Sequence, residues 1–269
     1  MIHIVNSANR HLYRAQIWDM FNERRKAFYE RCGWRDLMVF DGGEVDDFDD
    51  ERAIYLMALD EDEQLEGAVR ARPTDDRCIL ADKYPQMIGP DAPRLKGPEV
   101  WETTRIFTTQ RHRDRRAPGS RRAFEIGLAS MEVIAAAGGR RMVGMIDLHL
   151  FPMIADAGGE THVAGPPMEY AYGTMIATWV PIDDVEVGRI RESLGHPPLP
   201  ISYEVDDDDF RSFGSLAALQ HFVDRVRQTE ITTFDHDGAL PLRTVAQITA
   251  LYAKHDAGMA ELQSSVRSA

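Results

Sequence analysis

Two strand-like runs separated by four acidic residues constrain the fold of this chain more than any other feature. The first run, 53–59, is apolar throughout, and the second, 65–72, ends at Pro73. The acidic segment 60–63 between them has the length and polarity of a hairpin turn. We therefore predict an antiparallel hairpin whose first strand is buried.

Helices and further strands alternate around this hairpin. Strands are predicted at 2–5, 100–107, 142–146 and 175–182, and helices at 11–32, 120–137, 151–157 and 185–194. The Gly- and Asp-rich segment 34–50 is predicted to be a loop. A mostly β middle between helices indicates an α/β fold, an α+β three-layer sandwich.

The character of the chain changes after residue 200. Residues 206–209 are four consecutive aspartates, which indicate a solvated linker, and the apolar residues of 215–227 and 243–254 have helical spacing. We therefore predict one domain over 1–200, followed by an acidic linker and helical extension over 201–269.

The charge and cysteine content exclude several classes of function. A net charge of −13 argues against DNA or an anionic membrane as the main partner. No segment approaches the ~20 apolar residues of a membrane helix, and the first residues lack the pattern of a signal peptide. Two cysteines in a chain of this length suit a reducing compartment better than a disulfide framework. We therefore expect a cytoplasmic protein that binds neither nucleic acid nor membrane.

The first group of candidate site residues combines a cation, two rings and carboxylates. Arg24 and Phe28 are four apart and share a face of the predicted helix, and Trp34 follows the helix end. Asp46 and Asp49 lie in the acidic segment, where not every carboxylate can face one ligand. This mixture suits a cationic, aromatic, amino-acid-like ligand. The simpler interpretation is that the rings belong to the core and the acids to a solvated loop.

The second group is Arg70, Glu102 and Arg105. On a regular strand Glu102 and Arg105 would point to opposite faces, so they meet only at a bulge or a strand end. Charged residues among apolar neighbours are rarely buried without a partner. The group is therefore either an internal salt bridge or a carboxylate base beside an arginine that holds a substrate anion.

A segment rich in arginine lies between a predicted strand and a predicted helix. Its arginines are Arg111, Arg113, Arg115, Arg116, Arg121 and Arg122. Arginines at a helix N-terminus can bind phosphate, whereas the alternative is a solvated basic loop. The segment lacks the P-loop pattern, and the chain shows no metal-ligand spacing and no nucleophile-elbow motif.

These three groups, in this order, resemble the acyl-homoserine-lactone synthases, the LuxI-type autoinducer synthases of quorum sensing. The positions that match the family pattern in order and spacing are Arg24, Phe28, Trp34, Asp46, Asp49, Arg70, Glu102 and Arg105. The glycine of the acidic motif is matched only loosely, by Gly42 and Gly43 ahead of Glu44. The resemblance covers about residues 1–195, and the tail has no counterpart in it.

The resemblance implies a GNAT-like acyltransferase with a splayed central mixed sheet. It implies transfer of an acyl group from acyl-CoA or acyl carrier protein to the amine of S-adenosylmethionine, then lactone closure with release of methylthioadenosine. No cofactor or metal is expected. Glu102 is the candidate base, or a residue that orients the amine, and Arg105 acts beside it. S-adenosylmethionine is expected to contact Arg24, Phe28, Trp34, Asp46, Asp49 and Arg70.

The acyl pocket and the donor site are expected on the central strands and the arginine-rich segment. The pocket candidates are Trp101, Thr104, Phe107, Gly144 and Ile146. Gly144 falls where some members carry a hydroxyl residue associated with 3-oxo chains, which favours an unsubstituted, branched or aryl acyl group. The arginines would bind the phosphates of coenzyme A or the acidic face of a carrier protein. The alternatives are a GNAT-like enzyme for another amine and a non-catalytic binding protein.

Overall fold

The computed structural model describes residues 1–6, 9–50, 52–111, 120–156, 158–193, 195 and 201–202. The predicted helices at 215–227 and 243–254 and the aspartate run lie outside these residues, so the extension and the boundary at 200 stay predictions. The main sheet of the described residues has nine strands in the order β11-β1-β4-β5-β6-β7-β10-β8, with β9 paired to β10. Its pairing is mostly antiparallel, and the pairs β6–β7 and β1–β11 are parallel.

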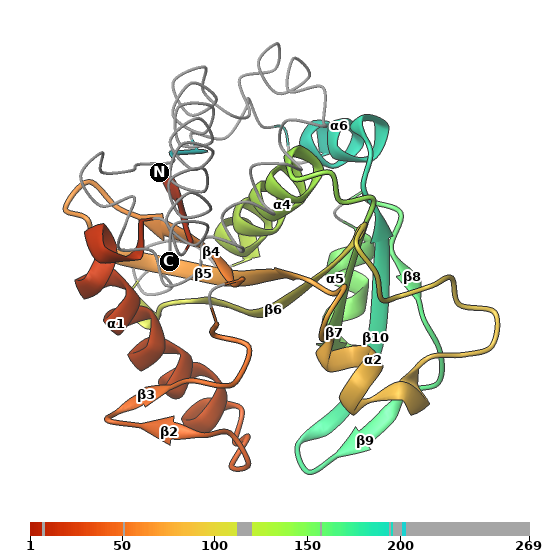
Figure 1. Cartoon of the computed structure of the whole chain (residues 1–269), viewed down its shortest axis with the longest axis horizontal. Coiled ribbons are helices and arrows are strands. Elements are labelled where there is room, and N and C mark those ends of the chain that lie inside the picture. Colours follow the sequence, from red (N-terminus) through yellow and green to blue (C-terminus); the bar gives the residue numbers. More distant parts are fainter. Residues whose placement is uncertain are drawn as a thin grey trace, which may run out of the picture.

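The strands β1, β4, β5, β6, β7 and β10 match the six predicted ones in order along the chain, whereas the short strands β8, β9 and β11 were not predicted (Figure 1). The strands of the main sheet are β1 (Ile2–Val5), β4 (Ile54–Leu59), β5 (Leu65–Pro73), β6 (Val100–Thr108), β7 (Arg141–Asp147), β8 (His162–Val163), β9 (Met168–Tyr170), β10 (Gly173–Pro181) and β11 (Ile201–Ser202). The predicted hairpin is the pair β4–β5, with Ile54 opposite Ala71 and Leu59 opposite Leu65. Every residue of β4 is buried, as its unbroken apolar sequence predicts.

The first helix is continuous but changes its winding. A 3₁₀ turn (Arg10–Tyr13) leads into α1 (Arg14–Arg24), which passes into a π-helix (Arg25–Arg31). The helix ends before Gly33, whose φ of 71° is readily adopted only by a residue without a Cβ. The remaining helices are α2 (Ile79–Lys83), the 3₁₀ turns at Pro85–Met87 and Leu148–Leu150, α4 (Ser120–Ala136), α5 (Phe151–Ala155) and α6 (Asp184–Ser193).

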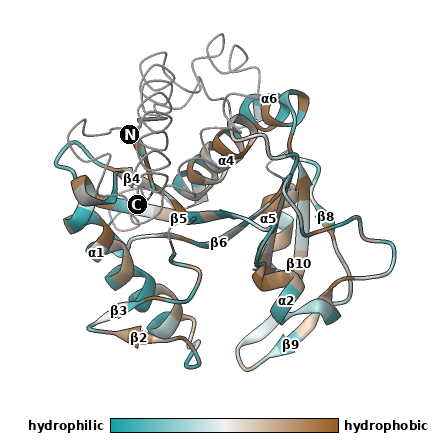
Figure 2. Cartoon of the chain, in the orientation of Figure 1, coloured by the Kyte–Doolittle hydropathy of each residue, from teal (hydrophilic) through white to brown (hydrophobic). Residues whose placement is uncertain are grey.

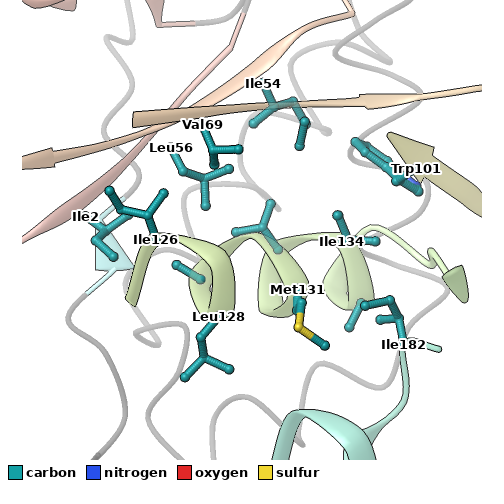
Figure 3. Close-up of a cluster of buried hydrophobic side chains, with 14 of the residues drawn as sticks. Ile2, Ile54, Leu56, Val69, Trp101, Ile126, Leu128, Met131, Ile134 and Ile182 are labelled. Atoms are coloured by element: carbon teal, nitrogen blue, oxygen red, sulfur yellow. The ribbon is translucent and has the colours of Figure 1, made fainter. Parts of the chain in front are cut away.

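The hydrophobic core divides between the two faces of the sheet. On one face α4 packs Ile126 and Ile134 against Ile54, Leu56 and Val69 of the central strands (Figure 3). Each such side chain withdrawn from water contributes roughly 1.5–3 kcal/mol. On the other face Met20 and Phe28 of the first helix cover Tyr55 and Met57, and a third cluster lies around α2. The sandwich of helices around a mixed sheet is the predicted fold class.

The segment 34–50 departs from the prediction of a loop. It contains a small hairpin made of β2 (Val39–Phe40) and β3 (Gly43–Glu44). Asp41 and Gly42 form its turn with φ values of 47° and 87°, the backbone that favours an Asp-Gly pair in a two-residue hairpin. Figure 2 shows β2 as a hydrophobic patch, and both of its residues are exposed. The Asp-Gly pair in the sequence was the missed indication of this hairpin.

The central strands part near the middle of the sheet. β6 and β7 pair only from Val100 opposite Arg141 to Glu102 opposite Val143, although both strands continue beyond these residues. Figure 1 shows β7 and β10 turning steeply away from β5 and β6. This is the splay that the family resemblance implies. Within the described residues, no helix combines the length and apolarity required to cross a membrane.

Candidate active site

A bulge in β6 brings Glu102 and Arg105 to the same face of the sheet. Arg105 has a φ of 57°, and the pairing of β5 with β6 shifts between Ala68 and Arg70. The extra residue changes the strand alternation, so side chains three apart no longer point in opposite directions. From the sequence, Glu102 and Arg105 were expected to meet only at a bulge or a strand end, and the structure contains that bulge.

Three arginines and three carboxylates form one ionic network beneath the first helix. Arg24 donates from Nε to Glu44 at 2.6 Å and from both terminal nitrogens to Asp49 at 2.7 and 3.0 Å. Arg70 pairs with Asp46 and reaches Asp49 at 2.9 Å. Arg105 donates to Glu44 at 2.9 Å and to Asp46 at 3.0 Å. The formal charges of the six side chains balance.

The network has a buried end and an open end. The side chains of Arg24 and Asp49 are 1% exposed and that of Glu44 is 0% exposed, whereas those of Arg105 and Asp46 are 11% and 18% exposed. All three nitrogen atoms of the Arg24 guanidinium already have carboxylate partners. Arg24 and Asp49 therefore support the site from below, and Asp46 and Arg105 face the ligand space.

The arginines keep the buried aspartates ionised. Burial alone would raise the pKa of Asp49, but the charges of Arg24 and Arg70 outweigh burial and hold that pKa well below its usual range. The pKa of Asp46 is lowered in the same way, against burial, by the hydrogen bond and charge of Arg70. Asp46 is therefore a fixed negative charge at the open end.

The two predicted rings stack beside this network. Phe28 and Trp34 have ring centroids 5.3 Å apart and planes 25° apart, and the guanidinium of Arg105 lies 5.7 Å from the Phe28 centroid. The π-helix places Phe28 against Trp34 just after the helix ends, where the Trp34 amide donates to the Phe28 carbonyl at 3.0 Å. Phe28 belongs to the core cluster under the first helix, whereas Trp34 also lines a cavity.

A cavity of about 550 Å³ opens at this end of the network. Of the predicted site residues, Trp34, Asp46, Thr104 and Arg105 line it. Sequence reasoning missed the opposite walls, which are formed by Ile79, Lys83 and Tyr84 near α2 and by Met145, Met168, Tyr170, Tyr172 and Met175 near β7, β9 and β10. These residues come from segments without a motif, so only the fold brings them to the site. The volume suits a small-molecule ligand.

Glu102 holds the amino end of α2. One carboxylate oxygen accepts from the Leu80 amide and the other from the Ile79 amide, each at 2.7 Å. The side chain is 3% exposed and is not part of the cavity wall. Burial raises the pKa of Glu102, although the amides of Leu80 and Ile79 oppose the rise. The geometry shows an anchoring contact between this carboxylate and the start of α2.

The predicted acyl-pocket residues other than Trp101 divide between three places. Thr104 lines the cavity and accepts from Arg70 Nε at 3.0 Å, whereas Phe107 packs against Phe28 under the first helix. Gly144 follows Val143, the last β7 residue paired with β6, and a Cβ at Gly144 would lie 3.1 Å from the Thr103 carbonyl oxygen. Met145 lines the cavity, and because side chains alternate along β7, its neighbours Gly144 and Ile146 lie on the opposite face of the strand.

Trp101 requires a correction. It packs under α4 next to Ile134 (Figure 3). Trp101 precedes Glu102 on β6, so the two side chains point to opposite faces of the sheet. Its large apolar ring fills the core there and does not line the cavity. We therefore remove Trp101 from the acyl-pocket residues.

The arginine-rich segment is only partly described. Arg113, Arg115 and Arg116 lie outside the described residues. Arg122 pairs with Glu66 and Glu125, both at 2.6 Å, so internal carboxylates already neutralise it. Arg111 and Arg121 are more exposed and have looser pairs, at 3.3 Å each. In the part of the chain that the structure describes, no cluster of three or more His, Cys, Asp or Glu side chains is arranged to hold a metal ion.

Comparison with known proteins identifies the class to which this fold and site belong. Residues 8–190 match the autoinducer synthase family, so the chain belongs to that family. The predicted family and enzyme class, an acyltransferase of the acyl-homoserine-lactone synthase type, are confirmed.

Individual relatives match over different lengths. An isovaleryl-homoserine lactone synthase from Bradyrhizobium diazoefficiens is 34% identical over 118 residues, covering 42% of this chain and 51% of that relative. The chain thus matches about half the length of that protein. An acyl-homoserine-lactone synthase from Ralstonia solanacearum is 29% identical over 161 residues, covering 60% of this chain and 79% of that relative.

Solved structures confirm the fold. The CoA-dependent acyl-homoserine lactone synthase BjaI, solved with S-adenosylmethionine and isopentyl-CoA, has a TM-score of 0.68 at 25% identity. That match covers 77% of this chain and 94% of BjaI. The synthase LasI has a TM-score of 0.61 at 20% identity over 72% of this chain and 93% of LasI, which supports the fold alone. The predicted acyltransferase fold is confirmed by these superpositions.

Proposed function

We propose that this chain acylates the amine of S-adenosylmethionine with an acyl group from acyl-CoA and then releases an acyl-homoserine lactone. One observation carries the proposal: the cavity lies at the open end of a charge-balanced network, between stacked aromatic rings and the point where β6 and β7 part. A site for S-adenosylmethionine needs a carboxylate, an aromatic wall and access for a thioester. BjaI, which resembles this chain, was solved with these two kinds of ligand.

The open end of the network provides the contacts for S-adenosylmethionine. Asp46 attracts the cationic end of the ligand, and Arg105 offers its remaining terminal nitrogen to the ligand carboxylate. Trp34, braced by Phe28, forms the aromatic wall. Arg24, Asp49 and Arg70 act indirectly, because they hold Glu44 and Asp46 in place.

The first step forms an amide bond. The neutral amine attacks the thioester carbonyl, an N–C bond forms, the C–S bond breaks, and the thiol of coenzyme A leaves with the proton from the amine. An α-amine has a pKa of about 7.7–8.0, so a substantial neutral fraction exists near neutral pH without a strong base. Glu102 is therefore assigned a positioning role, since it holds α2 and with it the cavity residues Ile79 and Lys83.

The second step closes the lactone. A carboxylate oxygen attacks the γ-carbon, the bond from that carbon to sulfur breaks, and the sulfonium takes the electron pair to become methylthioadenosine. The thioester and the sulfonium supply both leaving groups, so the proposed chemistry needs no cofactor. Its main requirement is proximity between the carboxylate and the γ-carbon, which the bound geometry must enforce.

We assign the acyl group to the space where β6 and β7 part. Thr104 on β6 and Gly144 and Ile146 on β7 follow the last paired residues of these strands, and the absence of a hydroxyl at Gly144 favours an unsubstituted or branched chain over a 3-oxo chain. The named product of the Bradyrhizobium relative, a branched isovaleryl lactone, supports the same class. Phosphates of coenzyme A are assigned to exposed arginines such as Arg111 and Arg121. Both substrates are cytoplasmic metabolites, and we place the enzyme there.

The proposal is tested by expressing the chain in a bacterium that makes no lactone and analysing the medium by mass spectrometry. A homoserine-lactone fragment ion is expected, and the variant Asp46→Asn should lower its yield at least tenfold. Purified protein should use acyl-CoA in preference to the matching carrier-protein thioester. Soluble protein that acylates another amine and yields no lactone would support the GNAT-like alternative instead.

The role of Glu102 has its own test. The variants Glu102→Gln and Glu102→Asp are compared with wild type in the pH profile of kcat/KM. A positioning role predicts a lower rate in Glu102→Gln with the same profile shape, and partial recovery in Glu102→Asp. Loss of an acidic limb only in Glu102→Gln would restore Glu102 as the base.

A further inference from the structure

The cavity wall carries three cations, and they differ in their partners. Arg105 is held by Glu44 and Asp46. Lys83, the last residue of α2, is exposed to the cavity, and no carboxylate among the described residues lies within ion-pair distance of it. Arg35 stacks on Tyr29, with 4.7 Å between its guanidinium carbon and the ring centroid. Lys83 and Arg35 thus each contact an aromatic ring and have no carboxylate within ion-pair distance among the described residues, so their positions in the cavity wall distinguish them.

Lys83 lies beside the part of the site assigned to the amino-acid end of the ligand. Its Nζ is 5.2 Å from the centroid of the buried Phe48 ring. The Phe48 amide donates to Asp46 Oδ1 at 2.9 Å, so ring and carboxylate belong to one short turn. In an amino acid the amine and the carboxylate are attached to the same carbon. A cation that binds the carboxylate must therefore share the part of the cavity that Asp46 lines. Lys83 lines the same cavity and lies against Phe48, two residues from Asp46, whereas Arg35 follows Trp34 at the aromatic wall.

The helix that carries Lys83 is anchored at its start, and the Lys83 side chain contacts a buried ring at its end. The Ile79 and Leu80 amides at the start of α2 are bound by Glu102, and the Lys83 side chain lies against Phe48 at its end. An ammonium held on a short anchored helix loses less freedom when it binds an anion than one on a mobile loop. Glu102 thus contributes to the site through Lys83.

We propose that Lys83 binds the carboxylate of S-adenosylmethionine and makes the enzyme selective for a ligand that carries it. This inference rests on the proposed function. When Lys83 binds the carboxylate, Asp46 can bind the cationic end of the ligand. The carboxylate then lies on the same side of the cavity as Arg105. Lys83 therefore orients the group that closes the lactone.

The test measures equilibrium binding of S-adenosylmethionine and of its decarboxylated analogue by calorimetry, so it does not depend on turnover. The proteins are wild type, Lys83→Met, Lys83→Arg and the matched control Arg35→Met, each checked for native circular dichroism. Wild type is expected to prefer S-adenosylmethionine over the analogue about tenfold, as for one charge-assisted pair partly shielded from water. Lys83→Met should lose most of the preference, with the remainder due to Arg105, and Lys83→Arg and Arg35→Met should keep the full preference.

Four results would overturn the proposal. Three of them concern the preference for S-adenosylmethionine over its analogue: it is unchanged in Lys83→Met, it is lost in Arg35→Met, or wild type does not show it. The fourth is that Lys83→Met binds isovaleryl-CoA more weakly than wild type but binds S-adenosylmethionine equally well. Failure of the proposed function is a separate observation, because it would appear as wild-type protein that binds the ligand but forms no lactone.

Discussion

The variant Glu44→Gln is predicted to be strongly destabilised because Glu44 joins two arginines in the buried half of the network. Its carboxylate accepts from Arg24 Nε at 2.6 Å and from Arg105 at 2.9–3.2 Å, and its side chain is fully buried. Glutamine keeps the shape but removes one negative charge and points an amide N–H₂ at a guanidinium. Breaking a buried ionic contact in this way costs about 3–5 kcal/mol, a large part of the total stability of a typical protein.

Urea unfolding followed by tryptophan fluorescence measures the effect. With a slope of about 2 kcal/mol per molar urea, the midpoint should fall by roughly 1.5–2.5 M. The matched control is Glu23→Gln, which breaks a 2.7 Å pair with Lys26 on the surface of the first helix. That change should cost less than about 0.5 kcal/mol. Equal midpoints for the two variants would refute the network as a buried structural unit.

Three further predictions concern acid stability, thiol reactivity and the mouth of the cavity. The lowered pKa of Asp49 means that its contribution to stability is complete above its ordinary value of 3.8 and is lost as the pH falls through the lower folded-state pKa. The unfolding free energy of wild type should therefore fall below about pH 4 more steeply than that of Asp49→Asn, as measured by urea titration at each pH. Burial, with the nearby charge of Glu102, raises the pKa of Cys78 to about 12, so iodoacetamide at pH 8 should label Cys78 only after unfolding, by mass spectrometry. In Gly33→Ala a Cβ would lie 2.6 Å from the Tyr172 ring at a φ of 71°, and S-adenosylmethionine binding should weaken at least fivefold by calorimetry.

The strands and helices of the sheet could be predicted because their apolar patterns are local. The run 53–59 is apolar over its whole length, the run 100–107 is rich in β-branched and aromatic residues, and both are strands. The hairpin β2–β3 was missed because its strands have two residues each, too few for a periodic pattern. The five-residue α2 was missed for the same reason, and its position depends on a contact with Glu102 from a distant strand.

The site could be predicted only in part because motifs identify residues and not their directions. The sequence indicated Asp46 and Arg105, which line the cavity, but placed Arg24 and Asp49 beside the ligand, where the structure buries them. Burial depends on how the first helix covers the sheet, which spacing alone does not determine. Glu44 also lies in the acidic motif. Because a buried Arg24 needs a carboxylate partner, Glu44 could have been identified as a site residue.

The central claim, that one cavity couples acylation to lactone closure, is tested most directly by stoichiometry. Purified protein is incubated with S-adenosylmethionine and isovaleryl-CoA, and three products are quantified by mass spectrometry over time. We predict equal amounts of lactone, methylthioadenosine and free coenzyme A at every time point. Free coenzyme A accompanied by an open-chain acyl product, without methylthioadenosine, would contradict the claim.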